Sequence, residues 1–165
     1  MATQNMILSA ETAARKLKRM ALEVCERNYA SDEIIFLGIK DNGSMIAREI
    51  AELMAETFKS KITVVDLFIN KKQPCEITLS DKIDINNKVV VLVDDVANSG
   101  RTMLYSLKPL LLHLPKKIQT LALVERTHKL FPIAVDYVGV SVSTTLEENI
   151  EVEIEGGKVL GAWLR

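Results

Sequence analysis

The chain has 165 residues and carries 21 Lys and Arg against 22 Asp and Glu, which gives a formal net charge of -1. Hydrophobic residues make up 48% of the chain, enough apolar surface to exclude an intrinsically disordered protein. The balanced charge argues against a globally basic nucleic-acid binder. The length is typical of one domain, which we expect to span residues 1–165.

Cysteine usage and hydropathy bear on the compartment. The two cysteines, Cys25 and Cys75, are too few for a secreted disulfide scaffold, and neither belongs to a CxxC pair that would favour zinc or dithiol chemistry. Residues 1–8 lack the charged and apolar regions of a secretory leader. The longest apolar runs, such as residues 89–93, are far shorter than the ~20 residues of a membrane span. The sequence therefore predicts a cytoplasmic protein with no membrane partner.

The first third of the chain predicts alternating helices and strands. Ser9 is a suitable N-cap for a helix that we expect to reach about Asn28, because apolar residues follow it at helical spacing. A short apolar run over 34–39 predicts a strand that is buried on both faces. A polar turn at 40–43 follows this strand, and a second helix is expected near 44–58.

The segment 68–87 interrupts the alternation, because charged residues, a proline and several asparagines break any long periodicity. We expect it to form a flap that leaves the core after a strand over 62–67 and contains a short strand at 76–79. The clearest buried strand, 88–93, comes next, and a helix is expected near 101–113. Further strands are expected at 118–124, 136–142, 152–154 and 158–164, the last two joined by the hairpin signal Gly156-Gly157.

Strands that alternate with helices are typical of βαβ units. The sequence therefore predicts an α/β fold, a Rossmann-like parallel sheet of about five strands with flanking helices and the small flap. In such sheets, ligands bind at the carboxyl ends of the strands. Polar segments at 40–43, 94–102 and 125–126 lie at such ends, so we expect the functional site to be built from them.

The strongest chemical signal follows the clearest buried strand. Two adjacent carboxylates, Asp94 and Asp95, come first, and a loop of small and polar residues then leads into a helix. The backbone N–H groups of such a loop form an anion-binding site, to which Ser99 and Thr102 add hydroxyl donors while Gly100 allows close approach. Because two carboxylates repel the negative charge of a phosphate, Asp94 and Asp95 are better suited to bind hydroxyl groups or a cation. The pattern predicts a ligand with a phosphate at one end and a sugar diol beside it.

This segment resembles the phosphoribosyl-diphosphate binding motif of type I phosphoribosyltransferases. The resemblance implies the fold of that family and a transferase that uses Mg²⁺ to move a 5-phosphoribosyl group to a nucleobase. It assigns Asp94 and Asp95 to catalysis and, through ribose hydroxyls or water, to the metal. The residues implied to bind the ribose 5-phosphate are Val96, Ala97, Asn98, Ser99, Gly100, Arg101 and Thr102. The residues implied to form the diphosphate loop, which this fold often holds in a non-proline cis peptide, are Lys40, Asp41, Asn42 and Gly43.

Most of the chain also resembles the bacterial pyrimidine-operon regulators that are uracil phosphoribosyltransferases as well. The additional matching segments are 124–133 and 136–139. This resemblance implies that Tyr137 borders the base pocket, that Val138 offers backbone hydrogen bonds to the nucleobase, and that Arg126 lies near the diphosphate or the base. It also implies phosphoribosyl diphosphate and a nucleobase as partners, and a homodimer or homotetramer with residues 7–17 at the interface.

Two positions favour a pyrimidine base. Asn98 stands where purine-specific members carry an acid, and Glu125 stands where they carry a lysine donor, which an ionised carboxylate cannot replace. The flap lacks the arginine of the regulators, and Lys71 or Lys72 would bring charge there without the planar fork of arginine.

Two alternatives follow from these departures. One is a purine salvage enzyme for hypoxanthine or xanthine. The other is a non-catalytic sensor of the donor or a nucleotide that binds RNA through basic residues of the first helix. These basic residues are Arg15, Lys16, Lys18 and Arg19, and the pattern favours the solvated face of an amphipathic helix over RNA contact for them.

Overall fold

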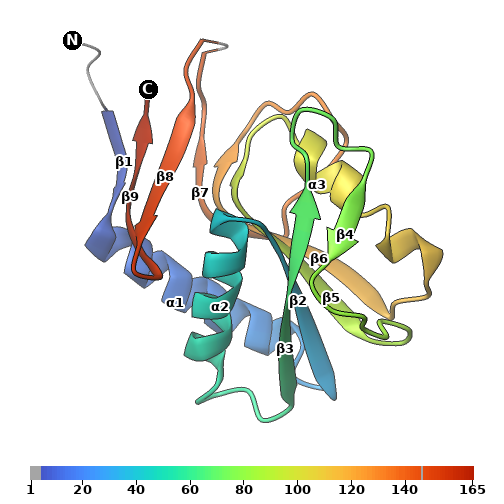
Figure 1. Cartoon of the computed structure of the whole chain (residues 1–165). Coiled ribbons are helices and arrows are strands. Elements are labelled where there is room, and N and C mark those ends of the chain that lie inside the picture. Colours follow the sequence, from blue (N-terminus) through green and yellow to red (C-terminus); the bar gives the residue numbers. More distant parts are fainter. Residues whose placement is uncertain (1–4, 146) are drawn as a thin grey trace.

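The computed structural model describes residues 5–145 and 147–165. Two sheets form its framework, a six-stranded sheet in the order β4-β3-β2-β5-β6-β7 and a three-stranded sheet in the order β1-β9-β8 (Figure 1). The expectation that residues 1–8 hold no secretory leader falls partly outside the described residues. In the described part of the chain, no helix is long and apolar enough to cross a membrane.

The central sheet confirms the predicted α/β class. Its strands are β2 (Glu33–Ile39), β3 (Lys61–Ile69), β4 (Ile77–Leu79), β5 (Val89–Ala97), β6 (Lys117–Arg126) and β7 (Tyr137–Val142). The five strands from β3 to β7 in the sheet order pair in parallel, and only the short edge strand β4 is antiparallel to its neighbour β3. The helices are α1 (Ala10–Arg27), α2 (Asn42–Met54), α3 (Arg101–Ser106) and the 3₁₀ helix η1 (Leu110–Leu112).

Side-chain alternation along the strands builds a separate core on each face of the sheet. Ile34 and Phe36 of β2 pack in the cluster that contains the buried faces of α1 and α2. Ile35 and Leu37 point the other way and pack in the cluster that contains Met103 of α3. Because helices or loops cover both faces, these strands can be continuous apolar runs. Figure 1 shows α1 and α2 together on one side of the sheet and α3 on the other.

The first helix begins and ends as its sequence predicts. The Ser9 hydroxyl accepts a hydrogen bond from the Thr12 backbone N–H at 3.2 Å, which satisfies one of the free donors of the first turn. At the other end, Asn28 is the C-cap, and its buried side chain donates to the Val24 carbonyl at 2.9 Å. The helix boundaries expected from capping are therefore confirmed.

Two predicted helices are shorter than their patterns suggest. The helix expected over 101–113 ends at Ser106, and the chain continues through turns into η1. Pro109 explains this break, because proline disfavours a helical residue before it and cannot donate to the helix ladder. The helix expected over 44–58 ends at Met54. A turn follows, in which the Phe58 N–H donates to the Met54 carbonyl at 2.8 Å.

The smaller sheet, which we call the hood, consists of β1 (Asn5–Ser9), β8 (Ile150–Glu155) and β9 (Lys158–Leu164). The hairpin predicted at Gly156-Gly157 is confirmed, and both glycines have positive φ there. Strand β1 was not predicted, because five residues at a sheet edge carry little pattern of their own. It pairs antiparallel with β9, with Asn5 opposite Leu164.

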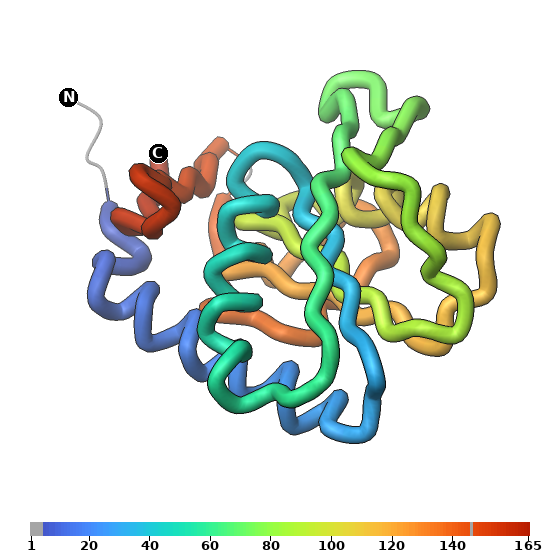
Figure 2. The backbone as a smooth tube through the Cα atoms, turned by 60° about the horizontal axis from the view of Figure 1, so that its bottom comes forward, coloured from blue at the N-terminus to red at the C-terminus, as the bar shows by residue number. Residues whose placement is uncertain are grey.

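The segment 68–87 begins with the last two residues of β3, because that strand is longer than the predicted 62–67; it then leaves the sheet and returns along its edge as β4. Leu67 and Leu79 pair across the antiparallel β3–β4 ladder, so the short strand predicted at 76–79 is present as β4. Figure 2 shows the light-green turn between β3 and β4 projecting from the body of the molecule. We refer to residues 68–87 as the flap.

Candidate active site

A cavity of about 300 Å³ lies at the carboxyl end of β5. Both predicted acids line it, and so does every residue of the predicted 5-phosphate loop except Arg101. Lys71 from the flap, Met103 from α3 and Ile150 from β8 complete the lining. The cavity therefore joins the acids and the loop to the flap and the hood.

The two acids differ in their surroundings. Asp94 is only 2% exposed, and its Oδ1 accepts a hydrogen bond from the Asp95 backbone N–H at 2.9 Å. Burial and the neighbouring Asp95 carboxylate raise the pKa of Asp94 well above its ordinary value, while Lys71, whose ammonium lies 4.0 Å from Oδ1, opposes that rise. Asp95 is partly exposed, and its Oδ1 accepts from the Val96 N–H at 2.9 Å. Positive charge entering the cavity would therefore favour the ionised form of Asp94.

The loop after the acids is fixed by backbone contacts. The Ser99 carbonyl accepts hydrogen bonds from the backbone N–H groups of both Leu130 and Phe131 at 3.0 Å. Gly100 has a φ of 83°, and a Cβ there would lie 2.5 Å from Cγ2 of Ile133. Position 100 thus requires glycine both for its left-handed backbone and for the close approach of the segment after β6.

The predicted diphosphate loop follows β2, and its Lys40–Asp41 peptide is cis, as the resemblance implies. The Lys40 N–H donates to the Leu67 carbonyl at 2.9 Å. Gly43 lies against β5 so closely that a Cβ would be 2.5 Å from the Val93 carbonyl oxygen. The loop is therefore held between β3 and β5, next to the acids.

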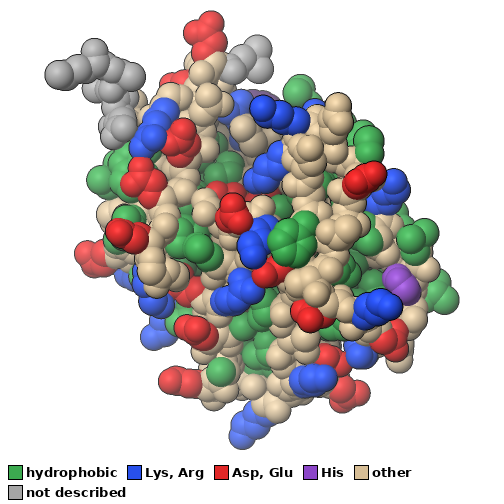
Figure 3. Space-filling model, in the orientation of Figure 1, with side chains coloured by type: hydrophobic (Ala, Val, Ile, Leu, Met, Phe, Trp, Pro, Cys, Tyr) green, Lys and Arg blue, Asp and Glu red, His purple; other side chains and the backbone are tan. Residues whose placement is uncertain are grey.

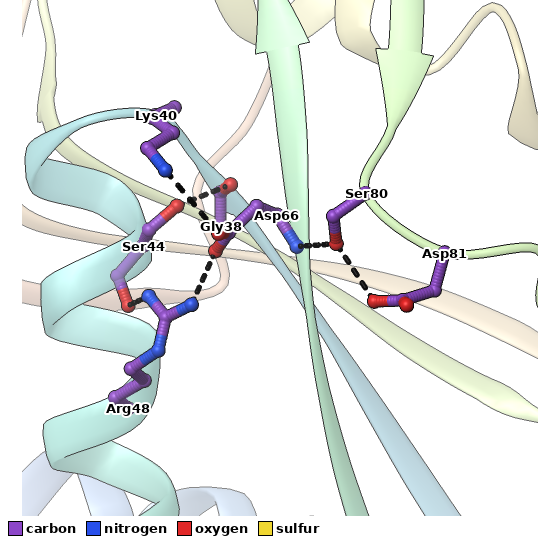
Figure 4. A network of polar contacts seen from close by, with 7 residues as sticks. All are labelled: Gly38, Lys40, Ser44, Arg48, Asp66, Ser80 and Asp81. Carbon is purple, nitrogen blue, oxygen red and sulfur yellow. Dashed lines mark hydrogen bonds and ion pairs between the residues drawn. The ribbon is translucent and has the colours of Figure 1, made fainter.

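Asp66 of β3 organises the cations beside this loop (Figure 4). Its Oδ1 accepts from Arg48 at 2.8 Å, and its Oδ2 lies 3.6 Å from the Lys40 ammonium. Burial raises the pKa of Asp66, but hydrogen bonds from Ser44 and Arg48 and the charge of Lys40 outweigh it, so the pKa is lowered. Two cations share one carboxylate here, which leaves positive charge beside the loop.

Asn42 connects the loop to the acid pair. Its side-chain amide donates to Asp95 Oδ2 at 2.8 Å and to the Val152 carbonyl of β8 at 3.0 Å. Lys40 and Asp41 do not line the cavity at Asp94; they line a separate hollow with Phe68 and Thr78. The expected diphosphate loop therefore reaches the acids through Asn42.

Tyr137, which the resemblance assigns to the base pocket, lies in the core of the protein. It is fully buried, its hydroxyl donates to Gln119 at 2.9 Å, and it accepts from Asn28 at 3.2 Å. Tyr137 pairs with Leu121 in the middle of β6, several residues before the carboxyl end of that strand. The register of β7 thus places Tyr137 in the core beneath α1, outside the lining of the cavity at Asp94.

The other two residues expected at the base also have contacts within the fold. The Val138 carbonyl accepts from the Arg19 guanidinium of α1 at 2.8 Å. Arg126 donates to the Glu148 carbonyl at 2.6 Å and so ties the end of β6 to the segment that precedes β8. Neither residue lines the cavity at Asp94.

Ile150 is a cavity residue that sequence reasoning missed. Ile150 is the first residue of β8 and is 7% exposed. The sequence indicates a hairpin in this region, but nothing local indicates that the hood packs against the end of β5. Ile150 therefore gives the cavity an apolar side chain opposite the polar loop and the acids.

The carboxylates of Asp94 and Asp95 could also act as ligands of a cation. Among residues 5–145 and 147–165, no three His, Cys, Asp or Glu side chains are grouped as metal ligands. Two adjacent carboxylates beside an open cavity fit a cation that takes most of its ligands from a bound substrate. Asp94 and Asp95 therefore suit Mg²⁺ carried by a ligand rather than a closed metal centre.

Comparison with known proteins agrees with this geometry. The phosphoribosyl transferase domain family matches residues 3–155. The chain is 35% identical over 163 residues to bifunctional protein PyrR of Bacillus cereus (strain AH820), covering 91% of this chain and 90% of the relative. It is 32% identical over 163 residues to bifunctional protein PyrR of Staphylococcus epidermidis, covering 93% of both. The chain therefore belongs to the phosphoribosyltransferase family.

Solved structures establish the same fold. A hypoxanthine phosphoribosyltransferase from Trypanosoma cruzi is similar with a TM-score of 0.79 and 10% identity, covering 97% of this chain and 95% of that one. A hypoxanthine-guanine phosphoribosyltransferase from Bacillus anthracis is similar with a TM-score of 0.72 and 22% identity, covering 91% and 87%. At these identities the likeness concerns the fold alone.

Proposed function

We propose that the protein is a phosphoribosyltransferase that moves a 5-phosphoribosyl group from phosphoribosyl diphosphate to a nucleobase, with uracil as the favoured base. One observation carries this proposal: a single cavity joins the buried Asp94 and its neighbour Asp95 to the loop of residues 96–102. The two acids suit a ribose diol, and the loop suits a phosphate. Both lie at the edge of the sheet where ligands of this fold class bind.

Each group in the cavity has a role in this reaction. The loop anchors the 5-phosphate, and that remote binding energy orients the reacting carbon. Asp94 and Asp95 orient the ribose hydroxyls and stabilise positive charge that develops on the sugar as diphosphate leaves. Mg²⁺ bound with the donor would neutralise charge on the leaving diphosphate, and Asp94 and Asp95 would hold it through ribose hydroxyls or water. The flap closes over the cavity to exclude water.

The choice of uracil rests on two positions. Asn98 lines the cavity without a charge, so it offers no carboxylate to a purine. Glu125 lies 3.3 Å from the Lys129 ammonium, and its carboxylate is an acceptor rather than the lysine donor of purine-specific members. Hypoxanthine or xanthine is the alternative substrate.

A regulator that binds RNA is the second candidate, because the relatives above are named bifunctional. Arg15 and Lys18 are exposed on α1 and could contact phosphates. Arg19 is less available, since it bonds to Glu23 at 2.6 Å and to the Val138 carbonyl. On the face shown in Figure 3, basic and acidic side chains are interspersed rather than segregated.

We also propose a single cytoplasmic domain that assembles as a homodimer or homotetramer through residues 7–17. Within the chain, Leu8, Ala13 and Leu17 already belong to the core. Only the outward face of this segment is therefore available to a second copy.

One experiment separates these functions. The protein is incubated with Mg²⁺, phosphoribosyl diphosphate and, in turn, uracil, hypoxanthine, guanine and xanthine, and nucleotide formation is measured. Formation of uridine monophosphate supports the proposal, whereas a purine nucleotide names the alternative base. Donor binding without turnover, together with RNA binding that weakens with salt, supports the regulator. A protein that binds no donor overturns both.

A further inference from the structure

The side-chain amide of Asn42 connects two parts of the molecule that share no sequence neighbourhood. An amide nitrogen carries two hydrogens, and here one points to Asp95 Oδ2 at 2.8 Å and the other to the Val152 carbonyl at 3.0 Å. The first acceptor belongs to the acid pair at the end of β5. The second belongs to hood strand β8.

On the acid side, this contact completes the support of the Asp95 carboxylate. The Val96 N–H holds Oδ1 at 2.9 Å, and Asn42 holds Oδ2. Asp94 is buried next to it and accepts from the Asp95 N–H, so two carboxyl groups lie side by side. A neutral amide can fix Asp95 in this crowded position without adding a further charge.

On the hood side, the same amide fixes the strand that supplies Ile150. Val152 is two residues beyond Ile150, so the two side chains share one face of β8. The hood hairpin and its approach have other ties, between Arg126 and the Glu148 carbonyl and between Lys158 and Glu49 at 3.2 Å, and neither of these two contacts involves Asp94 or Asp95. The Asn42 contact is therefore a tie between the hood and the acids directly beside the cavity.

We propose that Asn42 is a positioning residue that sets the Asp95 carboxylate and hood strand β8 in one fixed arrangement. The acid side and the Ile150 side of the cavity then depend on the same amide. The consequence for ligand binding rests on the function proposed above, whereas the tie itself exists in the ligand-free protein and can be measured there.

Two substitutions test this role, with a matched control. Asn42→Asp keeps the shape but places a second carboxylate against Asp95 and against the Val152 carbonyl. Asn42→Ala removes both donors without adding charge, which keeps the test informative should the first variant fold poorly. Asn149→Asp makes the same amide-to-acid change at a position next to Ile150, outside the cavity at Asp94.

In the ligand-free protein, we expect backbone amides of β8 to exchange hydrogen about tenfold faster than wild type in Asn42→Asp at pH 8. Asn42→Ala, which loses the same two donors without adding charge, should show faster exchange of the same amides. With Mg²⁺ and phosphoribosyl diphosphate, calorimetry should give about tenfold weaker donor binding for both Asn42 variants, and the KM for the base should rise as well. In Asn149→Asp, the exchange rates of β8, the donor affinity and the KM for the base should all stay within about twofold of wild type.

The proposal would be overturned if Asn42→Asp and Asn149→Asp had the same β8 exchange rates and the same donor affinity. Faster exchange with unchanged donor affinity and base KM would also overturn it, because Asn42 would then be merely structural. If wild type binds no donor, the proposed function fails and the effect on donor binding fails with it. Hydrogen exchange of β8 in the two Asn42 variants would still decide whether the tie between Asp95 and β8 exists.

Discussion

The ammonium of Lys71 lies 4.0 Å from Asp94 Oδ1, although the two residues come from the flap and from the end of β5. The next residue, Lys72, faces a different hollow, lined by Pro74, Arg101 and Tyr105. The sequence offers both lysines as replacements for the arginine that the flap lacks. The structure turns Lys71 toward the acids.

We predict that Lys71→Met weakens binding of phosphoribosyl diphosphate about tenfold, a loss of ~1.4 kcal/mol. Among the described residues that line the cavity, Lys71 is the only basic side chain, so its loss removes the cation that faces an anionic ligand. Lys72→Met is the matched control and should change the affinity by less than about twofold. Calorimetry with Mg²⁺ measures both, and equal losses in the two variants would contradict the assignment of Lys71.

Asp94→Asn should stabilise the ligand-free protein at neutral pH while abolishing its transfer of phosphoribosyl groups. Burial and Asp95 raise the pKa of Asp94, so the folded state holds its proton more tightly than the unfolded chain does. The stability that this proton provides is present below the ordinary pKa of 3.8 and is lost as pH rises through the raised value. We therefore expect Asp94→Asn to have a larger free energy of unfolding than wild type at pH 7, because its neutral amide carries no buried charge.

Urea unfolding at pH 7 and pH 4 measures this difference. The gain of Asp94→Asn over wild type should be largest at pH 7 and should shrink at pH 4. A variant that is less stable than wild type at pH 7 would show that the Asp94 carboxylate is already compensated in the folded protein.

Gly100→Ala should distort the loop that we assign to the 5-phosphate. The φ of 83° disfavours any residue with a Cβ, and the new methyl group would meet Cγ2 of Ile133 at 2.5 Å. We expect the free energy of unfolding to fall by about 1–3 kcal/mol and donor binding to weaken further than stability alone explains. Gly157→Ala, at a φ of 78° with open space around it, is the control for backbone strain without the contact. Similar donor affinities in the two variants would argue against the role of the loop.

Tyr137→Phe distinguishes a core residue from a base-pocket residue. It removes the hydroxyl that bonds to Gln119 and Asn28 and leaves those two buried groups with fewer partners. Thermal or urea unfolding should show a loss of about 1 kcal/mol, while donor affinity and base KM stay unchanged. A raised base KM in this variant would restore Tyr137 to the base pocket.

For Ile150→Ala we predict the opposite effect on the KM for the base. Ile150 lines the cavity, and its truncation should raise the KM for the base about tenfold, because an apolar contact with the ring is lost. Its 7% exposure means that some stability is lost as well, so the comparison rests on base KM at a temperature where the variant remains folded. An unchanged base KM would place the base elsewhere.

The sequence by itself determined the features that depend on residues close together in the chain. Ser9 and Thr12 define the start of α1, and the contiguous segment from Asp94 to Thr102 already contains acids and loop in order. Such local motifs bring their chemistry together whatever the rest of the fold does. The parallel sheet could be expected for the same reason, since each strand is a short apolar run followed by a polar turn.

Only the tertiary structure decided which distant residues face those acids. The register of β7 against β6 places Tyr137 in the core, whereas packing of the hood brings Ile150 and Val152 to the end of β5. The choice between Lys71 and Lys72 depends in the same way on how the flap turns beside β3. Register, sheet packing and loop direction are set by contacts between segments far apart in sequence, and no local pattern records them.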